Sequence, residues 1–208
     1  MISFDNSSIV IKKLELLRKY ASMVTVTKNS LTTKKMQIIF PDTQMLIKEV
    51  STVTLKISDL IQILTKSEQC TKNKNFIISK YKYNDIEIEK KYKKFDEVLV
   101  LPCSEPNLSI RINQILILSD SDFIIKCDQT GLFEMSSNSL IETEFKLKNC
   151  TIINSKIENV IVKVKSRDLK ILENFQNDKI FCFFSDYILV YILEDTITNI
   201  VMIPILLK

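Results

Sequence analysis

The stretch FIIKCDQTGLFEMSSNSLIETEFKLKN, residues 123–149, holds the only glycine of the 208-residue chain, and the rest of the architecture can be worked out from it. Apolar and polar residues alternate before Gly131, from Phe123 to Cys127, and again after it from Phe133, as in the two strands of a hairpin. Gly131 stands where a short hairpin loop closed by a bulge requires a positive φ. Residues 141–148 alternate in the same way and predict a third, half-buried strand.

The composition excludes several common enzyme mechanisms. With no histidine and one glycine, the chain cannot carry a dinucleotide-binding or Walker A loop, a GxSxG elbow, an HExxH motif or a histidine-based triad. Its five cysteines are widely spaced, form no CxxC pair and have no histidine to complete a zinc site. We therefore expect no catalytic residue, no metal and no cofactor, and scattered carboxylates leave an enzyme only as a remote alternative.

Charge and hydropathy indicate a globular protein that is compatible with nucleic acid. Hydrophobic residues make up 46% and charged residues 26%, and the net charge of +4 comes from 26 lysines and three arginines. A mild basic excess permits DNA binding, but a lysine-rich source genome would produce the same excess. No apolar run reaches the roughly 20 residues of a membrane span, and residues 1–13 lack signal-peptide features, so we expect an intracellular protein without membrane contact.

Helices and strands alternate twice along the chain. Periodicity predicts an amphipathic helix over 8–21, a second beginning at a Ser58 cap, a third over 108–119 and a fourth beginning at a Ser166 cap. Runs with β character fill the segments between them, including the apolar strand 98–101. Pro102 and Pro106 stiffen a short connector at 103–107.

The two halves share landmarks at a nearly constant offset, which indicates a tandem duplication. Four pairs lie 101 residues apart: Leu14 and Ile115, Leu17 and Leu118, Leu31 and Leu132, Asn84 and Ser185. Pro102 and Pro204 lie 102 apart, and Leu60 and Leu169 lie 109 apart. The prediction is an α+β fold with two similar domains, 1–102 and 108–208, each with two helices packed on antiparallel sheet.

The predicted helices expose more basic than acidic side chains. On a common surface these residues would form a stripe facing phosphates without regard to base sequence. Ordinary solvation by lysine explains any single one of them equally well. The predicted DNA-facing residues are Lys12, Lys19, Lys66, Arg111, Arg167 and Lys170.

Four segments of the second half carry a family resemblance: 122–149, 160–175, 180–195 and the terminal VMIPIL at 201–206. In order and character they resemble the C-terminal domain of eukaryotic sliding clamps. The Glu194-Asp195 pair, the IPIL at 203–206 and the Leu101-Pro102 dipeptide are closer to the hydroxyurea-sensitivity subunit of the heterotrimeric 9-1-1 checkpoint clamp than to the homotrimeric replication clamp. The first half agrees with the family only in the order of its elements.

The resemblance implies a DNA-clamp fold and a non-catalytic, nuclear subunit. Such a subunit forms a ring with two other clamp subunits, encircles double-stranded DNA and is opened by a clamp loader. Neighbouring subunits would pair edge to edge through 95–101 and 142–148. The candidate interface residues are Phe95, Val98, Val100, Thr143, Phe145 and Leu147.

Two other functions stay open at this point. One is a homotrimeric replication clamp that tethers polymerases, and the other is a β-rich scaffold protein that never touches DNA. The chain also departs from the family: it is short, nearly free of glycine and has a brief connector, which makes the partner-peptide groove beside the connector of replication clamps uncertain here.

Overall fold

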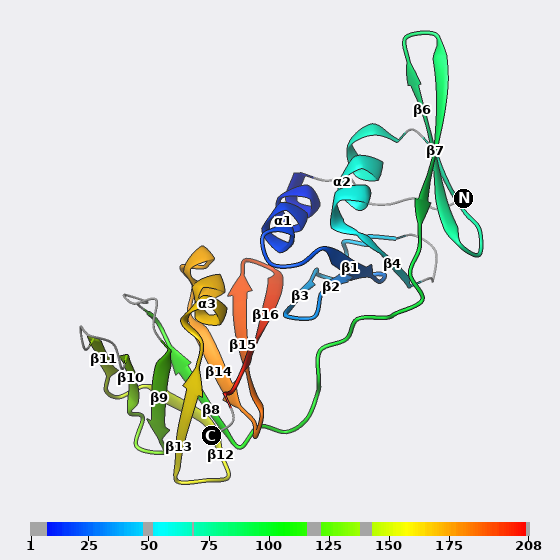
Figure 1. Cartoon of the computed structure of the whole chain (residues 1–208). Coiled ribbons are helices and arrows are strands. Elements are labelled where there is room, and N and C mark those ends of the chain that lie inside the picture. The colour runs from blue at the N-terminus through cyan, green and yellow to red at the C-terminus, as the bar shows by residue number, and fades with distance from the viewer. Residues whose placement is uncertain (1–7, 48–51, 68, 116–121, 138–142, 207–208) are drawn as a thin grey trace. The chain divides into compact units, whose positions relative to one another are not determined.

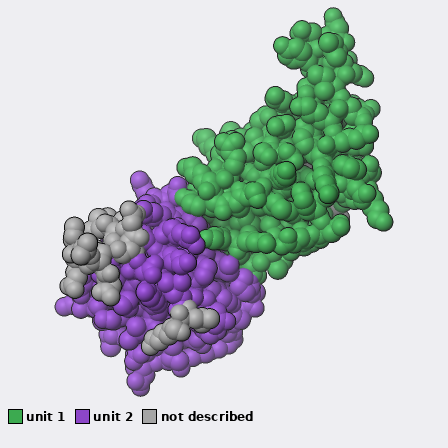
Figure 2. Space-filling model, in the orientation of Figure 1, with its two compact units in different colours: residues 1–101 green, residues 102–208 purple. Residues whose placement is uncertain are grey.

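The computed structural model describes residues 8–47, 52–67, 69–115, 122–137 and 143–206. The chain divides into two compact units, Met1–Leu101 and Pro102–Lys208 (Figure 2). Within the described part of the chain, no helix is both long and apolar enough to cross a membrane.

Within its described residues, unit 1 contains two helices and two antiparallel sheets (Figure 1). The helices are α1 (Ser8–Arg18) and α2 (Ile57–Lys66), which lie side by side. The first sheet has the order β3-β2-β1-β4, and the second has the order β5-β6-β7. Their strands are β1 (Met23–Val26), β2 (Ser30–Thr32), β3 (Met36–Ile39), β4 (Val53–Lys56), β5 (Gln69–Lys72), β6 (Phe76–Tyr83) and β7 (Ile86–Lys93).

Apolar residues at helical spacing bury one face of each helix in unit 1. On α1 the buried residues are Val10, Leu14 and Leu17, which recur every three or four positions. Helix α2 buries Leu60 and Ile63 in the same way. It begins directly where β4 ends, and the extended Lys56 occupies its N-cap position. The predicted Ser58 cap is therefore wrong, because Ser58 lies within the first turn.

The described residues of unit 2 form nine strands and one short helical segment. Its first sheet has the order β11-β10-β9-β13, and its second has the order β12-β8-β14-β15-β16. The helical segment is α3 (Ser166–Leu169), continued by the 3-10 turn η1 (Lys170–Asn174). The strands are β8 (Leu108–Ile112), β9 (Phe123–Asp128), β10 (Phe133–Ser137), β11 (Thr143–Leu147), β12 (Thr151–Ser155), β13 (Asn159–Val164), β14 (Lys179–Phe183), β15 (Tyr187–Glu194) and β16 (Ile197–Pro204).

The two sheets of unit 2 pack face to face over an apolar core. Phe133 of β10 meets Phe181 of β14 edge to face, with ring centroids 5.2 Å apart. Leu169 and Leu172 add to this core from the helical segment, as the sequence predicts. Ser166 is already the first residue of α3 and Lys165 occupies the N-cap position, so the predicted cap is wrong here as well.

The helix predicted over 108–119 is wrong at its start, because residues 108–112 form β8. Leu108, Ile110 and Ile112 are buried at a spacing of two, which is the period of a strand. Strand β8 pairs with β12 on one side and with β14 on the other. Residues 116–121 lie outside the described residues, so two helices are shown for unit 1 but not for unit 2.

The sheets of the two units repeat each other, with a changing offset. The order β3-β2-β1-β4 matches β11-β10-β9-β13, and β5-β6-β7 matches β14-β15-β16. In the last hairpin of each unit the offset is 111. Asn84 and Asp195 occupy equivalent positions in the two turns, and both have a φ of 53°. The predicted match of Asn84 with Ser185 is therefore wrong, because Asn84 joins β6 to β7 whereas Ser185 joins β14 to β15.

Gly131 has the conformation that the sequence predicts, with a φ of 87°. A Cβ at this position would lie 2.5 Å from the backbone oxygen of Cys150. The Cys150 amide also donates a hydrogen bond to the Gly131 carbonyl, at 2.9 Å. Glycine is thus required twice, for its backbone angle and for the close approach of the chain that leads into β12.

Candidate nucleic-acid interface and strand edges

In unit 1 the predicted DNA-facing residues lie on or next to the exposed faces of the helices. Lys12 is exposed on α1 and Lys19 directly after its last residue, while Lys66 ends α2. Arg18 is engaged with Glu15 at 2.8 Å, so part of the charge on α1 is balanced locally. Lysine near a helix C-terminus also complements the helix dipole, which gives Lys66 a structural role of its own.

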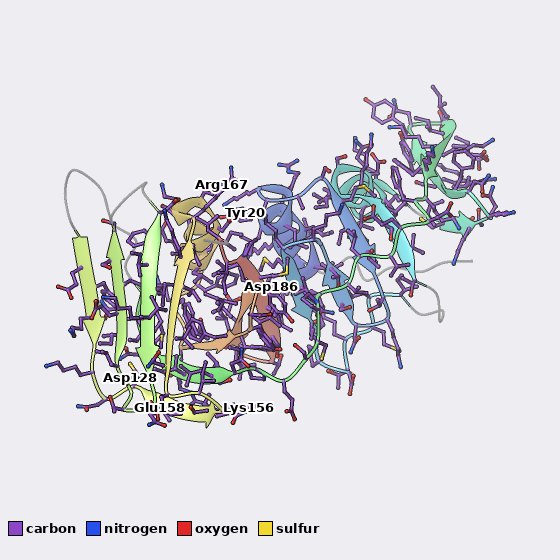
Figure 3. All side chains as sticks on the ribbon, turned by 60° about the horizontal axis from the view of Figure 1, so that its bottom comes forward. Tyr20, Asp128, Lys156, Glu158, Arg167 and Asp186 are labelled. Carbon is purple, nitrogen blue, oxygen red and sulfur yellow. The ribbon has the colours of Figure 1, made fainter. Side chains whose placement is uncertain are left out.

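In unit 2 two of the predicted residues lie on the short helical segment. Arg167 is exposed on α3 (Figure 3), and Lys170 is half-buried at the start of η1. Glu173 is exposed on the same segment and reduces its net positive charge. The segment therefore presents one exposed cation, Arg167, as a candidate contact for phosphate.

Arg111 does not belong with these helical residues, because it lies on strand β8. Its neighbour Ile110 is fully buried on the core face of the sheet, and successive strand residues point to opposite faces. Arg111 therefore points away from the core that Leu169 and Leu172 of the helical segment fill. Its assignment to a helix that faces DNA is corrected.

The edge strand predicted over 95–101 is not a strand. Only Phe95 forms a β-bridge, with Thr54 of β4, and Leu99 donates its amide to the Thr25 hydroxyl oxygen at 2.8 Å. These bonds attach the segment to the sheet of its own unit. Val98 and Val100 stay 54% and 74% exposed, so they are accessible without being part of a ladder.

Strand β7 is an edge of its sheet among the described strands of unit 1, since it pairs only with β6. Alternate residues give the distal half of the β6–β7 hairpin one charged and one apolar face. The apolar face is uncovered at its end, where Tyr83 and Ile86 are 66% and 64% exposed. Residues 95–101, which the family resemblance implies as a free edge, are therefore not an edge strand, whereas β7 is one.

Strand β11 has the edge position that the family resemblance implies for residues 142–148. It pairs only with β10 among the described strands of unit 2. Phe145 lies opposite the fully buried Met135 and is itself half-buried, as is Leu147. Thr143 belongs to the strand, but its side chain lies outside the described residues. Two apolar side chains at a free edge are suited to a subunit contact, which stays a prediction.

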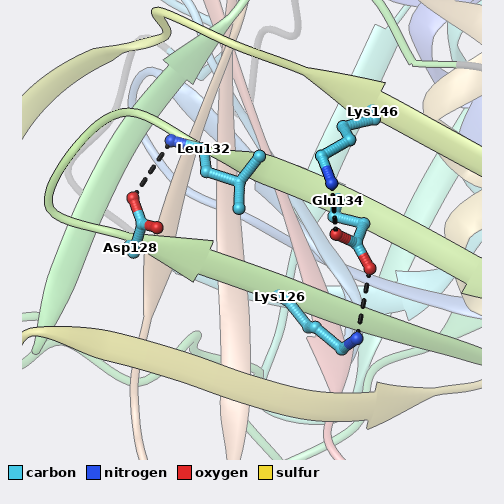
Figure 4. A network of polar contacts seen from close by, with 5 residues as sticks. All are labelled: Lys126, Asp128, Leu132, Glu134 and Lys146. Carbon is cyan, nitrogen blue, oxygen red and sulfur yellow. Dashed lines mark hydrogen bonds and ion pairs between the residues drawn. The ribbon is translucent and has the colours of Figure 1, made fainter.

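An ion-pair triad holds β11 to its sheet (Figure 4). The Glu134 carboxylate on β10 accepts hydrogen bonds from Lys126 of β9 at 3.1 Å and from Lys146 of β11 at 3.2 Å. These two lysines hold the pKa of Glu134 below its usual range. This triad was not predicted from the sequence, although the alternation of residues 123–147 places all three side chains on one face once the strand register is known.

The turn between β9 and β10 is fixed by Asp128. Its carboxylate accepts the Thr130 hydroxyl at 2.6 Å, the Thr130 amide at 2.8 Å and the Leu132 amide at 3.2 Å. The hydroxyl of Thr130 is the first cause that lowers the pKa of Asp128, and the backbone amides add to it. An aspartate that binds its own following backbone is a turn residue, so we assign it no catalytic role.

The described residues contain no group of three or more acidic or cysteine side chains that could hold a metal ion. The five cysteines form no disulfide. Burial raises the pKa of Cys70, Cys127 and Cys182, which keeps these thiols protonated and poorly nucleophilic.

Several solved structures share this fold. The proliferating cellular nuclear antigen of Entamoeba histolytica aligns with a TM-score of 0.61 and 10% identity over 95% of both chains. The corresponding antigen of Thermococcus kodakaraensis aligns with a TM-score of 0.60 and 12% identity over 99% of both chains. The beta clamp of Helicobacter pylori, solved with a DNA ligase peptide, aligns with a TM-score of 0.70 and 13% identity. That alignment covers 98% of this chain and 66% of the beta clamp.

Neither a protein-family model nor a curated protein sequence matches the chain. At these low identities the alignments establish the architecture alone. The chain has the mostly β fold of the sliding DNA clamps, a family without catalytic activity.

Proposed function

We propose that the chain is a non-catalytic subunit of a ring-shaped sliding clamp on double-stranded DNA. The observation that carries this proposal is the likeness to a clamp over 95% of both chains. Two further features support it: exposed cations on the helices of each unit, and an edge strand in each unit, β7 and β11, that pairs with one described strand alone. Phosphate contacts of this kind bind DNA without reading its bases.

Ring closure would pair β7 of one subunit with β11 of the next. Both are edge strands, and an edge presents unpaired backbone groups to another strand. This pairing replaces the segment 95–101 that the sequence suggests. Clamp subunits joined in this way would form a continuous sheet across each boundary.

The charges on β7 and β11 are complementary in one antiparallel register. Lys146 then faces Glu89, Glu144 faces Lys91, and the apolar Leu147 faces Ile88. Opposite charges directly across a strand pair are favourable, and like charges are unfavourable. One chain therefore carries both halves of a matched interface. This favours a homo-oligomeric clamp as the second candidate function.

The finer assignment from sequence, a subunit of the heterotrimeric checkpoint clamp, depends on the tail of the chain. Glu194 ends β15 and accepts a hydrogen bond from Asn199 at 2.9 Å, and Asp195 begins the turn to β16 with a positive φ. The occurrence of Glu194-Asp195 at this position is thus explained by the local structure, without reference to a particular clamp subunit. The checkpoint assignment, with two different partner subunits, a clamp loader and a nuclear location, stays a proposal.

Retention on closed circular DNA tests the clamp proposal. The assembled protein should stay on circular DNA and slide off linear DNA of the same sequence. Charge reversal of Lys12, Lys19, Lys66 and Arg167 should abolish retention, and reversal of the exposed non-helical residues Lys28, Lys72, Lys74 and Lys82 serves as the matched control. Equal retention on both DNA forms would contradict an encircling ring.

The mass of the purified protein separates the two finer assignments. A stable trimer of this chain alone supports the homo-oligomeric clamp. A monomer that forms a ring only with two other proteins supports the checkpoint subunit. The measurement is light scattering after size exclusion, repeated at increasing salt, because screening weakens the charge pairs of the β7–β11 register.

A further inference from the structure

We propose that a groove on the face of the β8–β14–β15 sheet opposite the core docks a short segment of a partner protein. The occupant carries an apolar side chain next to a carboxylate. The residues that line the groove all belong to unit 2 and include Arg111, Asp178, Ile180, Tyr191, Leu193 and Thr198, and its volume is about 620 Å³. The proposal depends on neither DNA binding nor ring closure.

The strand register places the groove on the face opposite the core. Ile110, Phe181 and Val190 lie side by side across β8, β14 and β15, and all three are fully buried in the core. The next row along these strands, Arg111, Ile180 and Tyr191, points to the opposite side. Ile180 and Tyr191 are only half-buried there, so this side of the sheet retains accessible apolar surface.

The connector occupies the other end of this face. Ser104 contacts the Tyr187 hydroxyl at 3.1 Å, and the Asn107 amide donates to the Phe183 carbonyl at 2.8 Å. At that end Leu189 is 2% exposed, whereas Leu193, four residues further along β15, is 60% exposed. An apolar floor therefore continues beyond the end of the connector.

One end of the groove is basic. Arg111 is exposed and makes no ion pair with any described residue, and a smaller adjoining cavity of about 290 Å³ adds Lys148 beside it. Asp178 lies on the rim of both cavities, so two cations face one anion. Arginine is rare in this lysine-rich chain, with three of 29 basic residues, and its planar head binds carboxylates bidentately.

These properties define the occupant. Burial raises the pKa of Tyr191, so its phenol stays neutral and offers a hydroxyl at the groove floor. Tyrosine, arginine and an exposed leucine around a cavity of this size form the kind of surface in which a few anchor residues carry binding. An apolar side chain fits against Ile180, Tyr191 and Leu193, and a carboxylate next to it reaches Arg111.

A random-peptide display library selected on the full chain tests the proposal. Peptides that pair Leu, Phe or Met with Asp or Glu should be enriched. Their synthetic versions should bind Arg111→Glu about tenfold more weakly, because a like charge replaces an attractive one. Leu193→Asp should weaken binding as well. Asp178→Asn should tighten it, which a misfolded variant cannot do.

Three results would overturn the proposal: no enriched peptide, enriched peptides without carboxylates, or equal affinity of Arg111→Glu for the selected peptides. Peptides with Asp and Glu replaced by Asn and Gln provide the matched control, and they should lose the dependence on Arg111. Unfolding midpoints of all variants should stay close to the unmodified chain, since the substituted side chains are exposed.

Discussion

Units 1 and 2 each contain a sheet with the same strand order, but their second sheets differ in size. Each has a four-stranded sheet of the same order, but the second sheet has three strands among the described residues of unit 1 and five in unit 2. The equivalent hairpins β6–β7 and β15–β16 show the consequence. Ile86 is 64% exposed in unit 1, and its counterpart Ile197 is 8% exposed in unit 2. The same hairpin is thus a covered core element in one unit and an accessible edge in the other.

The shared sheets differ in what lies over them. In unit 1, Thr25, Thr32 and Thr54 are buried, because the segment that contains Leu99 is bonded to this face. In unit 2, the positions equivalent to Thr25 and Thr32 are Lys126 and Glu134, which form the ion-pair triad. On this face of the sheet, unit 1 has threonine hydroxyl groups beneath a covering segment, and unit 2 has an ion-pair triad whose lysines are accessible to water.

The largest effect is expected at Gly131. Gly131→Ala places a Cβ against the Cys150 backbone at a φ of 87°, and the strain should destabilise unit 2 by about 3 kcal/mol. Hydrogen exchange at the amides of β9 and β10 measures the loss. Lys28→Ala in the corresponding turn of unit 1 is the control, with a change below about 0.5 kcal/mol. Equal losses at both turns would show that the close approach of Cys150 is unimportant.

The pair Ile86 and Ile197 tests the difference between the hairpins. Ile197→Ala should cost about 2 kcal/mol of unfolding free energy, because a buried side chain leaves a cavity. Ile86→Ala should cost below about 0.5 kcal/mol in the monomer, since the side chain is already in water. Urea unfolding measures both values. A large loss for Ile86→Ala at concentrations where the chain is monomeric would contradict an uncovered hairpin face.

The sequence predicts local features better than it predicts which segments cover which faces. The Gly131 turn and the burial of Leu14, Leu17, Leu169 and Leu172 follow from periodicity and turn chemistry, whereas the edge position of residues 142–148 is what the family resemblance implies. The helix predicted over 108–119 is wrong over 108–112, where the buried Leu108, Ile110 and Ile112 alternate with the period of a strand. The segment 95–101 has the apolar character of a strand. Its hydrogen bond to Thr25 and its bridge to Thr54 attach it to the sheet without forming a strand, and these long-range contacts cannot be seen in the sequence.

Part of the candidate site could be located in the same way. Lys12, Lys19, Lys66 and Arg167 are exposed as predicted, because a helix that buries one stripe must expose the other. Arg111 could not be placed, since its position depends on which element residues 108–112 form. The triad around Glu134 needs a cross-strand register, which no single strand contains.

The triad allows a charge-based test with a defined pH dependence. Glu134→Gln removes two ion pairs and should cost about 1 kcal/mol at neutral pH. The pKa of Glu134 is lower in the folded state, so its contribution is complete above the unfolded value of about 4.3 and disappears as the pH falls through the folded pKa. The unfolding free energies of Glu134→Gln and of the unmodified chain should therefore differ at neutral pH and converge at acidic pH. Thr32→Val in unit 1, which involves no carboxylate, should show no such convergence.

The smallest effect is expected from the strand edges, where unit 1 of one chain would meet unit 2 of another. In the register proposed here Glu144 faces Lys91, and both side chains are exposed. Glu144→Lys or Lys91→Glu alone should weaken self-association about fivefold, since an exposed attractive pair becomes repulsive. The double variant restores the attraction with its sign exchanged, so it should associate as tightly as the unmodified chain. Sedimentation equilibrium measures all four proteins. Additive losses in the double variant would reject this register, because the two edges of one chain would then not be complementary. Each edge could still pair with a different partner.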